Sequence, residues 1–462
     1  MNLTERDKDF IWHPFTQQKN MQPPVAVKNA RGSLLFDENG KEYIDAISSW
    51  WVNIHGHAHP YIAEKIYQQA LQLEHIIFAG FTHEPAVKLA ERLIKILPGN
   101  FSKIFFSDDG STSTEVAIKM AVQYWWNEKR ESSIRARAGQ VVNRQSSIVK
   151  SEAAEVRDET SNWQQETGNR KLETGNRKKI LAFNNSYHGD TFGSMSVSDR
   201  SVFTLAFHDL LFEVIFIDVP TEENIASTKK IIDEHAHEIA AFIYEPLVQG
   251  AGGMKMYSAT LMDELLLYIK QKNIICIADE VMTGFGRTGK MFASEYMQTK
   301  PDIICLSKGI TGGTMALGVT ACSEKIYTAF VNDDARKTFF HGHSFTANPV
   351  ACAAANASLD LFEQENSLQK VNFISEHNIA FAQQLRQLSG IKNVRVLGTV
   401  LAFEIIQGND EYLNNISSII TTKSLEKGVY IRPLGNTVYI MPPYCITEDE
   451  LQKAYAVLLE LV

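Results

Sequence analysis

A lysine and an aspartate each follow a strongly apolar run of the chain. Lys308 comes after DIICLS and before GITGG, so it should project from the end of a strand into a glycine-rich turn. Burial beside a strand lowers the pKa of a lysine amine and favours imine formation with an aldehyde. Asp279 ends the run IICIA, where a buried carboxylate needs a cation or a hydrogen-bond donor opposite it. Taken singly, either residue could simply close its strand.

Two further segments offer groups of a complementary kind. Gly110, Ser111 and Thr112 lie between KIFFSDD and the helical pattern EVAIKMA. Backbone N–H groups at a helix start, together with hydroxyls, can bind a phosphate, although the same residues could form a plain helix cap. Tyr187 and His188, in NSYHGDTFG, offer a ring that could stack on a flat ligand.

Together these groups match what pyridoxal phosphate (PLP) requires of a protein. The cofactor needs a lysine for its aldehyde, an acid beside its ring nitrogen, a phosphate site and a flat side chain against the ring. Because four modest signals agree within one chain, we predict that Lys308 and Asp279 bind opposite ends of one PLP ring. Tyr187 would pack against that ring, and Gly110 and Ser111 would hold the phosphate.

Alternating strand and helix patterns predict an α/β fold with a largely parallel sheet covered by helices. Several strand candidates are apolar throughout, as expected for strands buried on both faces, and ligands bind at the carboxyl ends of such strands. The candidates are 103–108, 179–183, 211–218, 239–245, 274–280 and 302–307.

The two ends of the chain are predicted to form a second, smaller α+β domain. Residues 348–366 and 373–388 are helix candidates, followed by strands at 393–398, 400–406 and 437–443 and a final helix at 446–462. Residues 25–46 carry hairpin signals such as DENG. We therefore predict a large PLP-binding domain at 47–346 and a small domain formed by 1–46 and 347–462.

A polar stretch from about 128 to 179 interrupts the large domain. It is weakly periodic and contains ETGNRK twice, at 166–171 and 173–178. Such a composition buries too little apolar area to offset chain entropy, so a disordered surface insertion is predicted. A partner-binding or regulatory arm is the alternative.

Composition narrows the class of protein. The chain has 462 residues, is 44% apolar and carries a net charge of −9, which argues against nucleic acid or an anionic membrane as partner. The five cysteines lack ligand spacing, the start MNLTERDKDF has no apolar signal region, and no uncharged run is long enough to span a bilayer. A cytoplasmic protein is predicted.

Two short motifs suggest other ligands but are discounted. GFGRTG fits the dinucleotide pattern G-x-G-x-x-G, yet DEVMT separates it from the strand and no helix opens within it. The histidines of HGHAHP lack carboxylate or cysteine company at ligand spacing, so no metal site is predicted.

With these residues in view, the chain resembles the class III, fold-type I PLP aminotransferases. IADEVMTGFGRTGKMFASE and LSKGITGG carry the resemblance, which covers nearly the whole chain outside 128–179. DAISSWWVNIHGHAHP, YHGDTFGSMSVSD and HGHSFTANPVACAAANASL are most similar to members that make 7,8-diaminononanoate for biotin synthesis. Those members aminate 8-amino-7-oxononanoate with S-adenosylmethionine as donor.

The resemblance implies a role for each matching residue. Lys308 is the implied Schiff-base lysine and Asp279 the partner of the ring nitrogen, with His188 beside the cofactor. His343 and Ser344 are implied to reach the phosphate from a second subunit, which implies a homodimer. The implied substrate contacts are Phe15, Trp50, Trp51, Tyr187, Gly342 and Arg432. Arg432 suits a substrate carboxylate because a guanidinium can donate two parallel hydrogen bonds.

Two positions depart from the family pattern. Phe15 stands where tyrosine is common, so the ring is kept and a substrate-contacting hydroxyl is lost. Relatives that use lysine as amino donor also resemble this chain at HPFT, whereas SSWW resembles the users of S-adenosylmethionine. Ser344 replaces the usual threonine and keeps its hydroxyl. Lysine as donor therefore stays open.

Three other functions also stay open from the sequence. The chain could be a class III aminotransferase for an ω-amine or a diamine, or a PLP-binding protein without turnover. A scaffold role that depends on residues 128–179 is the third.

Overall fold

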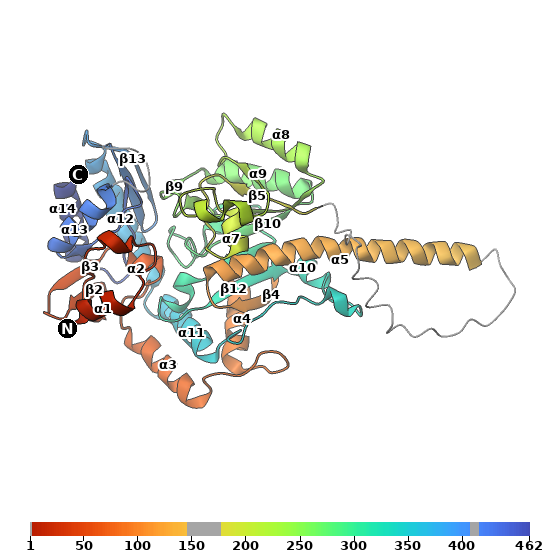
Figure 1. Ribbon diagram of the computed structural model, residues 1–462, viewed down its shortest axis with the longest axis horizontal. Helices are drawn as coiled ribbons and strands as arrows, with labels where there is room; N and C mark the ends of the chain where they lie inside the picture. Colours follow the sequence, from red (N-terminus) through yellow and green to blue (C-terminus); the bar gives the residue numbers. More distant parts are fainter. Residues whose placement is uncertain (1, 146–176, 407–414) are drawn as a thin grey trace.

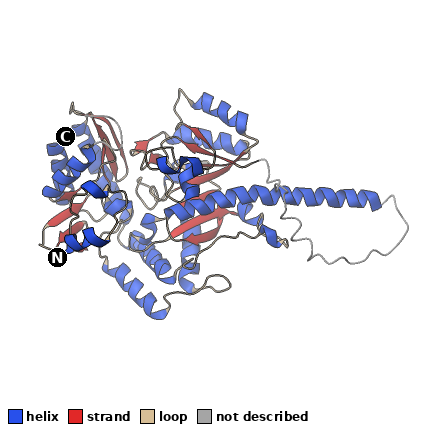
Figure 2. Cartoon of the chain, viewed as in Figure 1, coloured by secondary structure: helices blue, strands red, loops and turns tan. Residues whose placement is uncertain are grey.

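The computed structural model describes residues 2–145, 177–406 and 415–462, and these residues form two lobes (Figures 1 and 2). The segments from both chain ends lie together on one side, and the long α5 crosses the other lobe (Figure 1). Asp279 and Lys308 lie at the ends of two strands of the larger sheet.

The larger sheet has seven strands in the order β4-β12-β11-β10-β7-β5-β6. Neighbouring strands run parallel except β12, which is antiparallel to both β11 and β4. The strands are β4 (Phe101–Ser107), β5 (Lys179–Phe183), β6 (Val214–Ile217), β7 (Ile239–Tyr244), β10 (Ile275–Asp279), β11 (Ile303–Leu306) and β12 (Gly318–Ser323). All six predicted strands and the largely parallel α/β sheet are confirmed.

Both faces of this sheet are covered, which explains the uninterrupted apolar runs. In β5, Leu181 and Phe183 belong to one core cluster and Ile180 and Ala182 to the other. The first cluster includes the buried face of α9, and the second includes that of α5. Every residue of β7 and β10 is therefore buried, and alternation of apolar and polar residues is absent there.

Helices and short elements around this sheet complete the larger lobe. They are α3 (Pro60–Gln72), α4 (Glu84–Ile96), α5 (Gly110–Gln145), α7 (Phe192–Val197), α8 (Ile225–His235), β8 (Val248–Gln249), β9 (Lys255–Met256), α9 (Ala259–Gln271), α10 (Glu324–Thr328) and α11 (Pro349–Gln364). The short helical turn η5 (Lys308–Thr311) directly follows β11.

The second lobe joins the two ends of the chain. Strand β3 pairs in parallel with β15, so the N-terminal hairpin and the C-terminal segment share one sheet (Figure 1). Its elements are α1 (Leu3–Phe10), β1 (Val27–Arg31), β2 (Leu34–Asp37), β3 (Glu42–Asp45), α12 (Ser367–Leu385), β13 (Ile391–Leu397), β14 (Val400–Ile405), α13 (Ile416–Glu426), β15 (Val429–Tyr430), β16 (Thr437–Ile440) and α14 (Glu448–Leu461). The predicted hairpin is confirmed. The predicted domain limits stay a prediction. Helix α11 packs against α3, α4 and η5.

The polar insertion begins later than predicted. Helix α5 continues to Gln145 and projects beyond the body of the lobe, so residues 128–145 are helical rather than irregular (Figure 1). Glutamate, lysine, arginine, alanine and glutamine in this stretch are good helix formers, and the helix is already nucleated on the sheet. Residues 146–176, with most of the ETGNRK repeats, lie outside the described residues.

The histidines of HGHAHP bind protein groups. His55 hydrogen-bonds Ser358 Oγ at 3.0 Å, while His57 and His59 pair with Asp45 at 2.9 Å and Glu365 at 3.0 Å. Within the described parts of the chain, no three His, Cys, Asp or Glu side chains are grouped to hold a metal ion. Across the same residues, no helix is long and apolar enough to cross a membrane.

His55 predicts an acid-sensitive step in stability. Burial, with a smaller contribution from the charge of His59, lowers the pKa of His55 to about 3. The unfolded chain binds a proton here near its ordinary pKa of about 6.5, whereas the folded chain does not until about pH 3. Because of this residue, the free energy of unfolding should fall by about 1.4 kcal/mol for each pH unit between about 6 and about 3. Urea unfolding of wild type and His55→Asn between pH 6 and 4 should give a shallower slope for the variant, and equal slopes would contradict the assignment.

Candidate active site

Lys308 and Asp279 meet at the carboxyl edge of the central sheet. Asp279 is the last residue of β10, and Lys308 follows the end of the neighbouring parallel strand β11 by two residues. Both line one cavity of about 460 Å³. Parallel strands place their ends at a common edge, which is where ligands of such sheets bind. The structure thus brings together the two residues on which the predicted chemistry depends.

The Lys308 amine lies in a partly dehydrated position. Its backbone adopts a left-handed conformation with φ of 45°, unusual for a residue other than glycine. The Nζ atom lies 4.9 Å from the centroid of the Trp51 ring. Burial lowers the pKa of the amine, and the nearby carboxylates of Asp279 and Glu245 partly oppose this shift. A larger share of neutral, nucleophilic amine follows.

Asp279 is held rigidly by two donors. Its Oδ2 lies 2.7 Å from His188 Nδ1, and its Oδ1 accepts a hydrogen bond from the Val281 backbone N–H at 3.0 Å. Because a carboxylate only accepts, His188 must carry its proton on Nδ1 in this contact. Asp279 is 5% exposed, and the cavity is where its remaining lone pairs can meet a ligand donor.

The start of α5 also lines the cavity. Gly110 and Ser111 are the first residues of this helix, where backbone N–H groups lack partners within the helix. Ser111 Oγ accepts a hydrogen bond from the Asp190 N–H at 2.8 Å, and its own hydrogen can point to a ligand. A Cβ at Gly110 would lie 2.7 Å from Val281, and one at Gly189 would lie 1.9 Å from Ser111 Oγ. The close packing explains why glycine occupies both positions.

Tyr187 and Glu245 also line the cavity. The Tyr187 hydroxyl donates to Asp190 Oδ2 at 2.8 Å, and burial is the main reason that its pKa is raised. Glu245 accepts hydrogen bonds from the backbone N–H of Tyr187 and of Gly250. Burial raises the pKa of Glu245 to about 7, so this carboxyl group holds a proton more readily than an exposed glutamate.

An apolar slot of about 410 Å³ adjoins the cavity. The two share Trp51, Val52, Tyr187 and Lys308. The slot is lined mostly by aromatic and aliphatic side chains, among them Phe15, Trp50, Trp51, Phe203 and Leu434. Arg432 stands beside it, with its guanidinium carbon 5.0 Å from the centroid of the Trp50 ring. Arg432 Nη2 also lies 3.4 Å from the Phe15 carbonyl oxygen. The slot therefore has the Lys308 amine in its lining, and the positive charge of Arg432 lies against two other lining residues, Trp50 and Phe15.

The two tryptophans of the slot stand on a left-handed turn, α2 (Ser48–Trp51). All four residues have positive φ, between 45° and 74°, and none is glycine. For L-residues this conformation costs roughly 1–2 kcal/mol per residue. Surrounding contacts must therefore impose the turn.

The loop with Gly342, His343 and Ser344 is not part of this cavity. None of the three lines it among the described residues, and Gly342 and Ser344 are exposed. His343 Nε2 lies 3.9 Å from Asp108 Oδ1 at the cavity wall. The loop reaches the edge of the cavity within one chain but does not enter it.

Comparison with known proteins settles the family. The profile of the family described as "Aminotransferase class-III" matches residues 15–462. The chain is a class III aminotransferase. It is 40% identical to an adenosylmethionine-8-amino-7-oxononanoate aminotransferase from Synechococcus elongatus, over 98% of each chain. It is 37% identical to the enzyme of that name from Helicobacter pylori, over 100% of this chain and 98% of the other.

Solved structures agree with this fold. The crystal structure of an adenosylmethionine-8-amino-7-oxononanoate aminotransferase from Methanocaldococcus jannaschii matches this aminotransferase with a TM-score of 0.86. The two are 32% identical over 99% of this chain and 98% of the other. A PLP-bound amine transaminase from an uncultivated Pseudomonas species matches with a TM-score of 0.82 and 27% identity, over 98% of each chain. The prediction of a fold-type I, PLP-dependent aminotransferase is confirmed.

The cavity residues fit PLP. A buried amine and a carboxylate line one cavity together with a helix start, where Gly110 and Gly189 allow close contacts. His188 Nε2 is buried and has no hydrogen-bond partner among the described residues, although the ring is fixed through Nδ1. A ligand with an N–H, a phosphate and a flat ring would complement this set of groups.

Some lining residues of this aminotransferase were not identified from the sequence. Glu245 lines the cavity, Phe203 lines the slot, and Asp190 accepts a hydrogen bond from the Tyr187 hydroxyl. Glu245 ends the run IAAFIYE in the same way that Asp279 ends IICIA, so an acid at the end of a buried strand was the available signal. Phe203 lies in an irregular segment where nothing in the sequence marks it.

Proposed function

We propose that this aminotransferase transfers an amino group from S-adenosylmethionine to 8-amino-7-oxononanoate and so makes 7,8-diaminononanoate for biotin synthesis. The names of the relatives support this substrate pair. The observation that carries the proposal is the apolar slot that has Lys308 in its lining and the Arg432 guanidinium against its Trp50 wall. A long aliphatic acid whose reacting group lies far from its carboxylate suits such a slot.

PLP would be held by residues from several elements around the cavity. Gly110 and Ser111 would donate to the phosphate from the start of α5, and Tyr187 would pack against the ring with His188 close by. Asp279 would face the ring nitrogen, and a charge-assisted hydrogen bond would keep the proton there. When bound, PLP supplies an electron sink that stabilises negative charge on the carbon bearing the amino group.

Lys308 would act twice in the reaction. Its amine would hold the cofactor by the aldehyde until the donor takes its place. Once displaced, the neutral amine would take a proton from the amino-bearing carbon of the donor and deliver one to the acceptor in the second half of the cycle. The lowered pKa of Lys308 supports this role because the base must be unprotonated at neutral pH.

The acceptor would be positioned by its two ends. Arg432 would hold the carboxylate, while Trp50 and Trp51 would enclose the aliphatic chain and exclude water from it. Phe15 packs edge-on against Trp50, with ring centroids 5.3 Å apart, and would close the outer wall.

A homodimer would complete the site. Gly342, His343 and Ser344 of the partner subunit would reach the phosphate and the substrate. The exposure of Gly342 and Ser344 in the single chain supports that arrangement, since neither residue lines this chain's own cavity.

A panel of amino donors tests the proposal. The PLP-loaded protein is mixed with S-adenosylmethionine, lysine or ornithine without acceptor, and the visible absorbance of lysine-bound PLP is followed. S-adenosylmethionine alone should bleach it, and adding 8-amino-7-oxononanoate should restore it. Bleaching by lysine would instead indicate lysine as the amino donor. The absence of a hydroxyl at Phe15 is compatible with that outcome. A response to ornithine alone would indicate a diamine aminotransferase.

Arg432→Met should separate the acceptor from the donor. Loss of two charge-assisted hydrogen bonds should raise KM for 8-amino-7-oxononanoate about 10- to 100-fold. The rate of bleaching by the donor should change far less, because the proposed contact is made to the acceptor carboxylate. Arg386→Met, at an exposed arginine bonded to the Val394 carbonyl, is the matched control. An unchanged acceptor KM in Arg432→Met would refute the carboxylate assignment.

A further inference from the structure

We propose that Asp45 and His57 are positioning residues that hold the left-handed turn α2 and thereby set how tightly the acceptor's aliphatic chain is bound. This inference rests on the proposed function, since it concerns the same slot. Neither residue lines the cavity or the slot among the described residues.

The turn cannot be explained by its own residues. Ser48, Ser49, Trp50 and Trp51 all have side chains that disfavour positive φ. Within the turn, Trp51 N–H donates to the Ile47 carbonyl at 2.9 Å and Val52 N–H to the Ser48 carbonyl at 3.0 Å. A right-handed turn would offer equivalent backbone bonds. Contacts from outside the turn must therefore select the left-handed form.

Asp45 supplies the largest set of these contacts. It ends β3, is fully buried, and receives three hydrogen bonds on its two oxygens. Oδ1 accepts from the Ile47 N–H at 3.2 Å, and Oδ2 accepts from the Ser49 hydroxyl at 2.7 Å and from His57 Nε2 at 2.9 Å. The carboxylate thus holds the entry and the second residue of the turn.

His57 ties the far side of the turn to the same carboxylate. Asn53 Oδ1 accepts from the Gly56 N–H at 2.8 Å, so the Asn53 amide nitrogen faces His57 Nδ1 at 2.9 Å and donates to it. His57 must then carry its hydrogen on Nε2, which points at Asp45. The Asp45–His57 pair and Asn53 therefore fasten the chain before and after α2.

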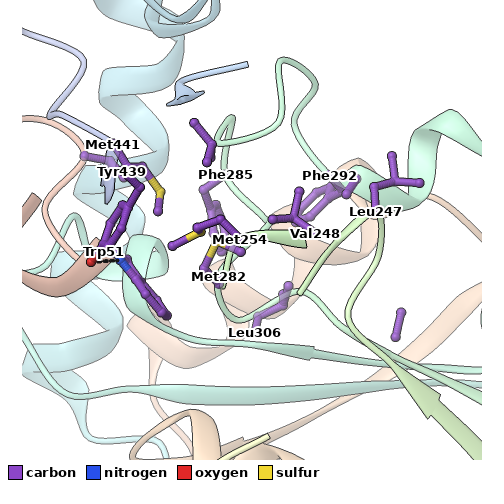
Figure 3. Close-up of a cluster of buried hydrophobic side chains, with 14 of the residues drawn as sticks. Trp51, Leu247, Val248, Met254, Met282, Phe285, Phe292, Leu306, Tyr439 and Met441 are labelled. Carbon is purple, nitrogen blue, oxygen red and sulfur yellow. Dashed lines mark hydrogen bonds between the residues drawn. The ribbon is translucent and has the colours of Figure 1, made fainter. Parts of the chain in front are cut away.

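We call Asp45, His57 and Asn53 the clamp. The clamp acts on the slot through the two tryptophans of α2. Trp50 stands between Phe15 and the Arg432 guanidinium, and Trp51 donates from Nε1 to the Tyr439 hydroxyl at 3.0 Å. Figure 3 shows Trp51 beside Tyr439 and Met441, on one side of the buried cluster. Asp279, Gly110 and Ser111 lie on other elements. Trp50 lines the slot and not the cavity, so loosening the clamp should move the wall of the slot at Trp50 and leave Asp279, Gly110 and Ser111 in place.

Asp45→Asn and His57→Gln test the clamp. An amide at position 45 turns a donor toward groups that already donate. Glutamine at 57 carries an acceptor and a donor on a flexible chain, so it holds Asn53 and Asp45 together less rigidly than the imidazole ring does. Each variant should raise KM for 8-amino-7-oxononanoate about tenfold or more, with kcat changed less than about threefold and PLP content unchanged. Their near-UV circular dichroism should differ from wild type in the tryptophan bands. His59→Gln, which breaks the comparable His59–Glu365 pair, should change none of these quantities.

A double-mutant cycle shows whether the effect passes through Trp50. In a Trp50→Phe background, Asp45→Asn should add much less to KM than it does in wild type, because the residue on which the clamp acts is already altered. Additive effects, or a normal KM in both single variants, would overturn the proposal. If Asp45→Asn fails to fold, His57→Gln gives the same reading. If wild type does not aminate 8-amino-7-oxononanoate, the proposed function fails, and the tryptophan bands of the variants still decide whether the clamp holds the turn.

Discussion

Lys308→Ala is expected to lose the visible absorbance of lysine-bound PLP and to lower kcat by at least about 10⁴-fold, the upper range for a positioned base. Both effects follow from one amine, which attaches the cofactor and moves the proton at the reacting carbon. Among the described residues that line the cavity, Lys308 is the only lysine, so no neighbouring amine can take over either task. Absorbance spectra and steady-state rates of the purified variant measure the two effects.

Lys325→Ala is the matched control for this loss. Lys325 is an exposed lysine whose amine bonds the Asn273 side chain, and it lies outside the cavity lining. Its removal should leave absorbance and rate unchanged. Turnover retained in Lys308→Ala would contradict the role given to this residue.

Asp279→Asn should be the second most damaging change, with kcat lowered about 10²- to 10⁴-fold. An amide keeps the size and can still accept from His188, so the fold should survive. It lacks the negative charge that holds a proton on the ring nitrogen, and each unit of pKa lost there corresponds to about 1.4 kcal/mol. PLP affinity should fall as well, which equilibrium dialysis would measure.

Asp233→Asn provides the comparison for Asp279. Asp233 is a surface carboxylate paired with Lys272, and its loss should have no effect on rate or PLP affinity. An Asp279→Asn variant with wild-type kcat would show that another group sets the protonation of the ring. Restored rate in Asp279→Glu would instead agree with the need for a carboxylate.

The sheet and the reacting residues were predictable because their signals are local. Each buried strand is a short apolar run, and Lys308 and Asp279 are the charged residues that end two of these runs. Adjacent parallel strands end at the same edge of the sheet. A charged residue that ends such an apolar run can therefore be assigned to that edge from the sequence. Glu245 also follows the end of a buried strand, β7, and lines the cavity. The same sequence pattern could therefore have identified it.

The other features depend on contacts that the sequence does not display. The left-handed turn at SSWW arises from Asp45, His57 and Asn53 around it, and serine and tryptophan themselves disfavour it. Helix α5 passes the point where apolar periodicity ends because a helix nucleated on the sheet can extend with polar helix formers. The contribution of Gly342, His343 and Ser344 depends on a second chain and stays a prediction.

The most direct test of the account is to locate the PLP-bearing lysine. The holoenzyme is reduced with borohydride, which fixes PLP to the amine that carries it, and is then digested and mapped by mass spectrometry. A single modified peptide containing Lys308, with modification lost after treatment with the amino donor, is the expected result. Modification at a different lysine, or at none, would contradict the central claim that the amine at the end of β11 and the carboxylate at the end of β10 serve one cofactor.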